Sequence, residues 1–160
     1  MSAMTDQAEY PLVLTLTFDI RCAHFAARVI SHGRALMAFE DSEWWCHGVD
    51  PGGLTACAEN PALAFPAFKE AYEGALLDLA ADAGSFDKFK LAVEGFVSDT
   101  DTNDEKRWLK AREEIRAGTD VDAFFNDLKR VTDNVSPWVV VESLDKVAPG
   151  SEQVGLAEAA

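Results

Sequence analysis

The sequence predicts an α+β fold in which a small antiparallel β-sheet is packed by helices. Segments with the two-residue alternation of strands lie mostly in the first 60 residues, whereas apolar residues at helical spacing follow residue 61. Turn signals, and not helices, separate most of the expected strands, which favours antiparallel neighbours. The chain has no internal repeat, and its length of 160 residues suits one domain.

The first expected strand covers residues 12–20. Its inward face would carry Leu12, Leu14, Leu16, Phe18 and Ile20. Val and Thr between them suit the opposite face of a half-buried strand. Residues 21–30 fit either an extension of this strand past a bulge or a short helix. Ser31, His32 and Gly33 form a turn signal that would end this segment.

Four further strands are expected after this turn. The first two, residues 35–39 and 44–49, would form a hairpin joined by a polar link. Residues 50–53, with the sequence Asp-Pro-Gly-Gly, then turn sharply, because proline presets φ and glycine accepts positive φ. A short strand at residues 54–58 follows, and residues 138–141 form a final apolar strand near the end of the chain.

The helices are predicted from their caps and their apolar spacing. Asn60 caps a helix with Pro61 at its first position. Pro66 leaves two alternatives, a separate turn at residues 61–65 or a kinked helix. Ser85 caps a second helix, and a capping box formed by Thr102 and Glu105 opens a third. A fourth helix would direct inward the apolar residues Val121, Phe124, Phe125, Leu128 and Val131.

These elements define the expected domain organisation. Residues 1–9 are a flexible arm, and residues 10–142 are a single domain. Within it, residues 34–83 form a nucleus and residues 85–133 form a helical C-terminal extension. Residues 143–160, poor in aromatic residues and rich in Ala, Gly and Glu, form a flexible tail.

The chain is strongly acidic, with 28 Asp and Glu against 14 Lys and Arg and a formal net charge of −14. This charge opposes binding to nucleic acid or to an anionic membrane surface. The third helix is locally basic, but interleaved acidic residues indicate a solvated face with ion pairs along the helix. Its charged residues are Asp104, Glu105, Lys106, Arg107, Lys110, Arg112, Glu113, Glu114 and Arg116.

No targeting segment is recognisable. Residues 1–9 lack a basic start and an apolar core, and no apolar run approaches the ~18 residues of a membrane span. The three cysteines Cys22, Cys46 and Cys57 are an odd number that cannot pair fully within the chain. We therefore expect a cytoplasmic protein with reduced thiols.

The candidate site residues are two adjacent tryptophans and a cluster of thiols and imidazoles. Trp44 and Trp45 point to opposite faces of their strand, so one faces outward and needs a cover, either a helix, the chain's own tail or a partner. Together with Asp50 they are the candidate partner-binding residues. Cys22, His24 and His47 are the alternative metal set, but the paired ligand spacing of structural zinc sites is absent. We expect no metal and no cofactor.

Residues 34–83 resemble the HicB-like domain, a small antiparallel sheet with a helix on one face that forms a partial RNase H fold. The matching pieces are residues 35–40, 44–49, 50–54 and 55–59, followed by the helix after Asn60 and Pro61. The resemblance implies an antitoxin-type module that binds a small mRNA-cleaving toxin. It implies no nuclease activity, because the partial fold lacks the catalytic carboxylates. The helices after residue 83 match no DNA-binding module.

These observations favour a non-enzymatic protein-binding module over an enzyme. Its acidity suits a small basic protein partner, and the unpaired edge of a small open sheet favours a homo-oligomer such as a dimer. The alternative is a metal-dependent hydrolase that uses Cys22, His24, His47 and nearby acidic residues.

Overall fold

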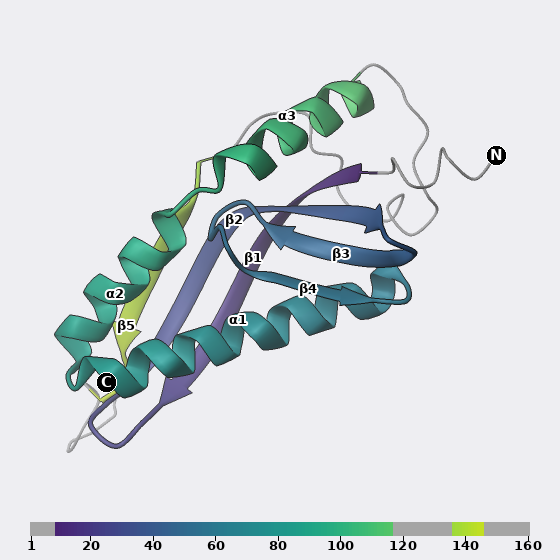
Figure 1. Ribbon diagram of the computed structural model, residues 1–160. Helices are drawn as coiled ribbons and strands as arrows, with labels where there is room; N and C mark the ends of the chain where they lie inside the picture. Colours follow the sequence, from purple (N-terminus) through teal and green to yellow (C-terminus); the bar gives the residue numbers. More distant parts are fainter. Residues whose placement is uncertain (1–8, 117–135, 146–160) are drawn as a thin grey trace.

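The computed structural model describes residues 9–116 and 136–145. A five-stranded antiparallel sheet is packed by three helices in this part of the chain (Figure 1), which confirms the predicted α+β class. The strands are β1 (Glu9–Arg21), β2 (Ala26–Glu40), β3 (Glu43–Gly48), β4 (Thr55–Ala58) and β5 (Trp138–Ser143). The helices are α1 (Pro61–Ala83), α2 (Phe86–Ser98) and α3 (Thr102–Arg116).

The long strand β2 is the centre of the sheet. β1 pairs with one of its edges from Ala26 to Ala38. Two strands share the opposite edge: β5 pairs with residues 27–32 and β3 pairs with residues 35–40. β4 then pairs with β3. Among the described strands, none pairs with Gly33 or Arg34 on the edge that β3 and β5 share.

The predicted turn at Ser31, His32 and Gly33 is wrong, because β2 runs through it without a break. Pairing on both edges overrides the local turn preference: His32 lies between Thr15 of β1 and Trp138 of β5. Gly33 is needed for a different reason. A Cβ at this position would lie 2.1 Å from the carbonyl oxygen of Asp50, so only glycine permits this close approach.

The structure decides between the two alternatives for α1 and corrects the predicted cap of α3. α1 is a single helix that contains Pro66, so residues 61–65 are not a separate turn. It begins with Asn60, whose Oδ1 accepts a hydrogen bond from Leu63 N at 2.9 Å, and ends at Gly84 with a φ of 77°. The cap of α3 is Asp101 and not Thr102, because Asp101 Oδ1 accepts from Asp104 N at 2.9 Å.

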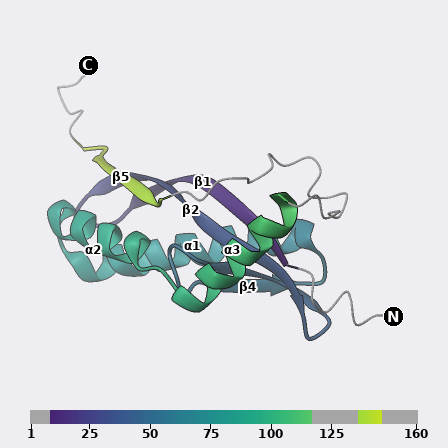
Figure 2. The ribbon, with the colours of Figure 1, turned by 90° about the horizontal axis from the view of Figure 1, so that it is seen from above.

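The sheet has a core on each face. On the inner face α1 packs against alternate residues of β1, including Leu16, Phe18 and Ile20, and α2 packs against β5 and β2 (Figures 1 and 2). On the outer face α3 packs Trp108 and Ala111 against Leu36 and Val49 in a second, smaller cluster. The predicted inward face of the first strand is thus confirmed, and α2 and α3 are integral layers of the fold.

The remaining predictions concern the two ends of the chain. Glu9 belongs to β1, and the final strand extends to Ser143. The rest of the arm, the proposed fourth helix with Val121, Phe124, Phe125, Leu128 and Val131, and the tail after residue 145 lie outside the described residues. No described helix combines the length and apolar character that crossing a membrane requires.

Candidate functional site

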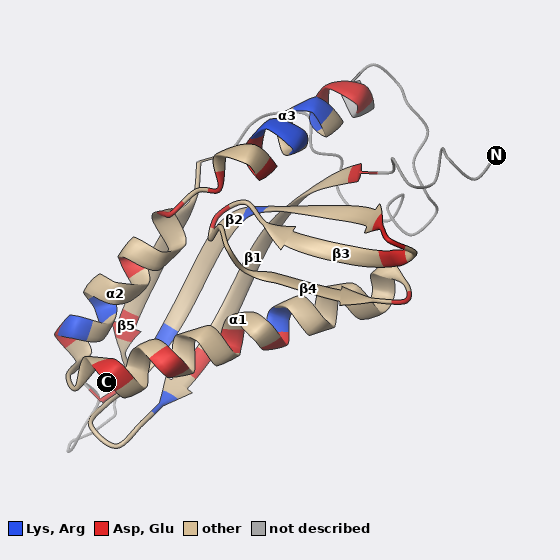
Figure 3. Cartoon of the chain, viewed as in Figure 1, with Lys and Arg blue, Asp and Glu red and all other residues tan. Residues whose placement is uncertain are grey.

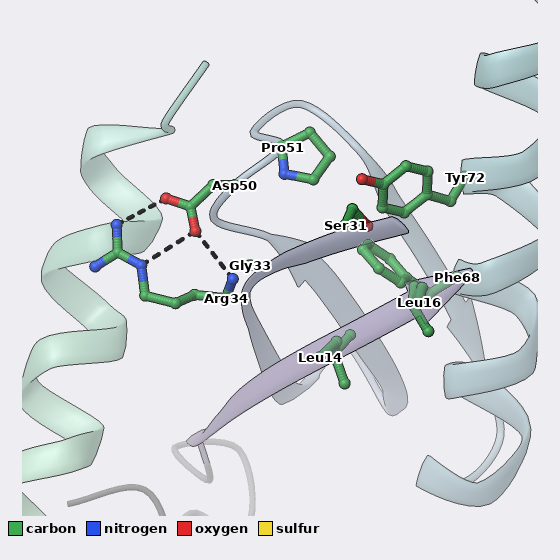
Figure 4. Close-up of a pocket in the computed structure, with 9 residues that line it drawn as sticks. All are labelled: Leu14, Leu16, Ser31, Gly33, Arg34, Asp50, Pro51, Phe68 and Tyr72. Carbon is green, nitrogen blue, oxygen red and sulfur yellow. Dashed lines mark hydrogen bonds and ion pairs between the residues drawn. The ribbon is translucent and has the colours of Figure 1, made fainter. Parts of the chain in front are cut away.

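Asp50 lies inside the protein, at the start of the Asp-Pro-Gly-Gly turn, and is 2 % exposed. Its Oδ1 accepts hydrogen bonds from Arg34 N at 2.9 Å and Arg34 Nε at 3.1 Å. Its Oδ2 accepts from Arg34 Nη2 at 2.7 Å and Thr100 Oγ1 at 2.9 Å. Figure 4 shows the bonds between Arg34 and the carboxylate. This carboxylate is fully engaged within the fold and is not presented to a partner.

The segment around Asp50 completes the edge of β2 where neither β3 nor β5 reaches. Val49 N and Asp50 N both donate to the Arg34 carbonyl oxygen, at 2.9 and 3.2 Å. The same segment binds the α2–α3 connection, since Asp101 N donates to the Val49 carbonyl oxygen at 2.9 Å. Asp50 therefore joins the sheet to α3, which makes its role structural.

Arg34 is the buried cation of this network. Its Nη2 also contacts Glu105 Oε2 at 2.9 Å, and its guanidinium lies 5.4 Å from the centre of the Trp108 ring. Burial disfavours the charged guanidinium, but the hydrogen bonds with Asp50 and Glu105 outweigh this effect and raise the pKa of Arg34 above its ordinary value. The arginine thus stays charged and paired inside the protein.

Trp44 and Trp45 point to opposite faces, as predicted. Trp44 packs on the inner face against Tyr10 and Phe39, with ring centroids 6.0 and 5.4 Å away. Trp45 lies on the outer face, where its ring stacks on that of His47 at 5.9 Å and its Nε1 donates to the Glu40 carbonyl oxygen at 3.2 Å. Both tryptophans are half-buried, so neighbours on the sheet already cover much of each ring.

A group of charged side chains surrounds Arg107, at the end of the outer face that carries Trp45 and His47. Arg107 pairs with Glu40, with Glu9 at 2.7 Å and with Asp104 at 3.3 Å. His47 Nε2 lies 3.2 Å from Glu40 Oε1. Burial raises the pKa of Asp104 above its ordinary value. Arg107 of α3 is thus paired with acidic residues, which agrees with the predicted ion pairs on a solvated helix face.

The alternative metal residues do not come together. Cys22 and His24 lie in the connection between β1 and β2, next to Ala26, whereas His47 pairs with Leu36. From Ala26 to Leu36, β2 rises about 33 Å at roughly 3.3 Å per residue. Within residues 9–116 and 136–145, no group of three or more His, Cys, Asp or Glu side chains is placed to hold a metal ion.

The structure shows one surface that the sequence analysis missed, on the outer face beyond α3. Three strands contribute to it, and two rows of side chains lie in register across β1, β2 and β5. We call this surface the outer patch, and its residues are Thr15, His32, Trp138, Thr17, Ile30 and Val140.

An aromatic stack lies at the centre of the outer patch. The rings of His32 and Trp138 are 5.3 Å apart and 9° from parallel, and Thr15 Oγ1 lies 2.8 Å from His32 Nδ1. Trp138 and Val140 are 46 % and 43 % exposed, so no described helix covers them. Large side chains of this kind usually lie under a cover, which makes the outer patch the candidate functional site.

The next row of the sheet, beyond the outer patch, is charged. Arg28 Nε pairs with Asp19 Oδ1 at 2.8 Å, and Glu142 lies in register with Arg28 on the other side. The Arg28 guanidinium holds the pKa of Asp19 below its ordinary value, mainly through this hydrogen bond. Arg21, two residues further along β1 on the same face, also lies close enough to lower the pKa of Asp19, so this row pairs two arginines with the two carboxylates Asp19 and Glu142.

One signal for the outer patch was present in the sequence. Residues 138–141 alternate in direction, so Trp138 and Val140 share a face that Val139 and Val141 do not. Because a turn was predicted at His32, the neighbouring strand was not expected to continue through this residue.

Comparison of the chain with known protein families, with curated proteins and with solved structures finds no match in any of the three. The function must therefore be inferred from the surfaces that this fold presents.

Proposed function

We propose that this chain is a non-enzymatic protein-binding module, of the antitoxin-like kind that the HicB-like resemblance implies, and that it binds a basic protein partner through the outer patch. The observation that carries this proposal is the exposed stack of Trp138 on His32, which lies on a flat sheet surface beside Val140. Tryptophan is enriched among the residues that contribute most to protein–protein binding.

The geometry of the outer patch suits a protein surface. Its side chains project from paired strands, and the stack on His32 restricts the Trp138 ring before a partner arrives. Binding would therefore order few additional side chains and lose little entropy. Thr15 and Thr17 provide hydroxyl groups at the border, where polar contacts with a partner are usual.

The charge of the molecule favours a basic partner. The chain carries a net charge of −14, and acidic residues are spread along its helices and strand ends (Figure 3). Beside the outer patch, Arg28 is already paired with Asp19 and also lies near Glu142, so its charge does not oppose a basic partner. A basic protein would therefore be attracted to this acidic chain over a distance.

The HicB-like part of the proposal rests on the order β2, β3, the turn at residues 50–53, β4 and α1. A small mRNA-cleaving toxin is the partner that this resemblance implies. The alternative, a metal-dependent hydrolase, requires Cys22, His24 and His47 to act together, and their separation along β2 gives it no support.

Self-association is a separate prediction. It is based on the outer edge of β1, which no described strand occupies.

The proposal is tested with a tagged full-length chain expressed in its native cells. Proteins that bind it are identified, the partner is purified, and its dissociation constant is measured by calorimetry for the wild-type chain and for two variants. Trp138→Ser changes the outer patch, whereas Leu91→Ser changes an exposed leucine of α2, 70 % exposed, on the other side of the sheet. We expect Trp138→Ser to weaken binding about tenfold or more, as for a central interface tryptophan, and Leu91→Ser to have little effect.

Three outcomes would overturn the proposal. Equal affinities of the two variants would show that the outer patch is not the interface. An acidic partner would refute the argument from charge. If light scattering shows that the wild-type chain is a dimer and that Trp138→Ser makes it monomeric, the occupant of the outer patch is a second copy of the chain.

A further inference from the structure

The hydroxyl group of Tyr72 is buried in the inner core. Tyr72 projects from α1 toward the sheet and is 2 % exposed. Its ring packs against Phe18 and Phe68, with centroids 4.9 and 6.2 Å away. Among the described residues, no atom meets full hydrogen-bond geometry with its hydroxyl, although the Ser31 hydroxyl lies close enough to lower its pKa. A hydroxyl that is buried without a hydrogen bond is costly, so this group requires an explanation.

A small cavity of about 10 Å³ adjoins Tyr72. It lies between α1 and the sheet, and its walls combine apolar side chains with polar ones. Its lining includes Leu14, Leu16, Ser31, Asp50, Phe68 and Tyr72 (Figure 4). Figure 4 shows the Tyr72 hydroxyl directed toward Ser31 and Pro51 across this space.

The size and the polarity of the cavity determine what can occupy it. A volume of roughly 10–15 Å³ is enough for one water molecule, and this cavity has about 10 Å³. Apolar cavities stay dry, but a buried water is favoured where two or more polar groups converge. Here the hydroxyl of Tyr72 and that of Ser31, which is 3 % exposed, supply these groups.

We propose that this cavity is the binding site of one internal water molecule, which accepts a hydrogen bond from the Tyr72 hydroxyl and bonds to Ser31 Oγ as its second partner. The water would satisfy the hydroxyl of α1 and connect that helix to β2, next to the segment that carries Asp50. This inference is independent of the proposed protein-binding function, because the cavity lies on the inner face of the sheet.

The protonation of Tyr72 agrees with a donor role. Burial raises the pKa of Tyr72 to about 12, the nearby Ser31 hydroxyl partly offsets this effect, and the negative charge of Asp50 strengthens it. At neutral pH the hydroxyl therefore keeps its proton. A water molecule in the cavity can accept that proton in a hydrogen bond and still donate its own two.

The direct test is a crystal structure of the full chain at a resolution that shows ordered water. We expect a density peak within 2.6–3.2 Å, the usual hydrogen-bond range, of both Tyr72 Oη and Ser31 Oγ. An empty cavity would overturn the proposal. A direct hydrogen bond between Tyr72 Oη and Ser31 Oγ, with no density in the cavity, would overturn it as well.

Urea denaturation provides a second test in solution. Tyr72→Phe and Ser31→Ala should each lower the midpoint concentration, because each leaves the water with too few partners. The double variant should lower it by less than the two single changes together, since both act on the same water. An unchanged or higher midpoint for Tyr72→Phe would contradict the proposal, and so would strictly additive effects.

Discussion

Asp50 accepts three hydrogen bonds from a single residue, Arg34: one from its backbone N–H and two from its guanidinium. The side chains of this pair are 0 % and 3 % exposed. Arg34 in turn lies beside Trp108, which is fully buried and donates from Nε1 to the Leu12 carbonyl oxygen at 3.1 Å. One ion pair thus connects the central strand, the Asp-Pro-Gly-Gly turn and α3.

Substitution of Asp50 should be strongly destabilising. Asp50→Asn removes the negative charge and leaves Arg34 buried with only partial compensation. We expect the free energy of unfolding to fall by about 3–5 kcal/mol, the usual cost of breaking a buried ion pair. Urea denaturation measures this loss. Asp19→Asn, which breaks the exposed pair with Arg28, is the matched control and should change the midpoint little. Similar losses in the two variants would refute the structural role of Asp50.

Two tryptophans should differ sharply in their contribution to stability. Trp108 is 0 % exposed, and Trp108→Ala leaves a large cavity and removes the hydrogen bond to the Leu12 carbonyl oxygen. We expect a loss of about 3–5 kcal/mol in the free energy of unfolding. Trp138→Ala removes a ring that is 46 % exposed and should cost much less. Thermal unfolding followed by circular dichroism compares the two variants, and a reversed order would contradict the described packing.

The contribution of Glu40 to the free energy of unfolding should depend on pH. Burial raises its pKa, but hydrogen bonds with Arg107 and His47 outweigh this effect, so the pKa of folded Glu40 lies below its ordinary value. A carboxyl group with a lowered pKa stabilises the fold above its unfolded pKa, and this stabilisation is lost as the pH falls through the folded value.

The pH prediction is checked by comparing the wild type with Glu40→Gln in urea between pH 7 and pH 3. The difference in unfolding free energy should be largest at neutral pH and should shrink below about pH 4.5, near the ordinary pKa of glutamate. A difference that stays constant over this range would show that the carboxylate contributes no charge interaction.

The thiol of Cys46 should react with a thiol reagent only after the protein has unfolded. Cys46 is fully buried in the inner core, and burial raises the pKa of its thiol to about 12. Cys57 is half-buried. A hydrogen bond with Glu43 is the main cause that raises the pKa of its thiol, and burial is the second cause. Because the thiolate is the reactive form, Cys46 should resist a thiol reagent in the native protein.

A Cys22→Ser/Cys57→Ser double variant isolates Cys46 for this measurement. Its remaining thiol should react with a chromogenic disulfide reagent only after urea is added. Rapid reaction of the native double variant would show that Cys46 is accessible and that the inner core does not enclose it.

Local signals in the sequence predicted much of this fold. The alternation of residues 12–20 and the Asn60 and Ser85 caps were each predicted correctly, because short-range interactions determine them. The continuous strand β2 was missed because His32 and Gly33 favour a turn locally, whereas pairing with β1 and β5 holds them extended. That pairing depends on residue 138, far along the chain.

The candidate site was less predictable for the same reason. The turn at Asp50 could be predicted, but its ion pair with Arg34 and the contact of that arginine with Glu105 join residues distant in sequence. The outer patch likewise exists only after β5 has paired with β2. Adjacent tryptophans at positions 44 and 45 gave a visible signal, whereas the more exposed Trp138 stood alone.

The central claim is that a basic protein partner binds the outer patch, and hydrogen–deuterium exchange of the full chain with and without the purified partner tests it most directly. We expect the partner to slow the exchange of backbone amides at residues 28–32 and 138–142, with little change along α1. Slower exchange confined to α1, or no change at the β2–β5 pair, would contradict the claim.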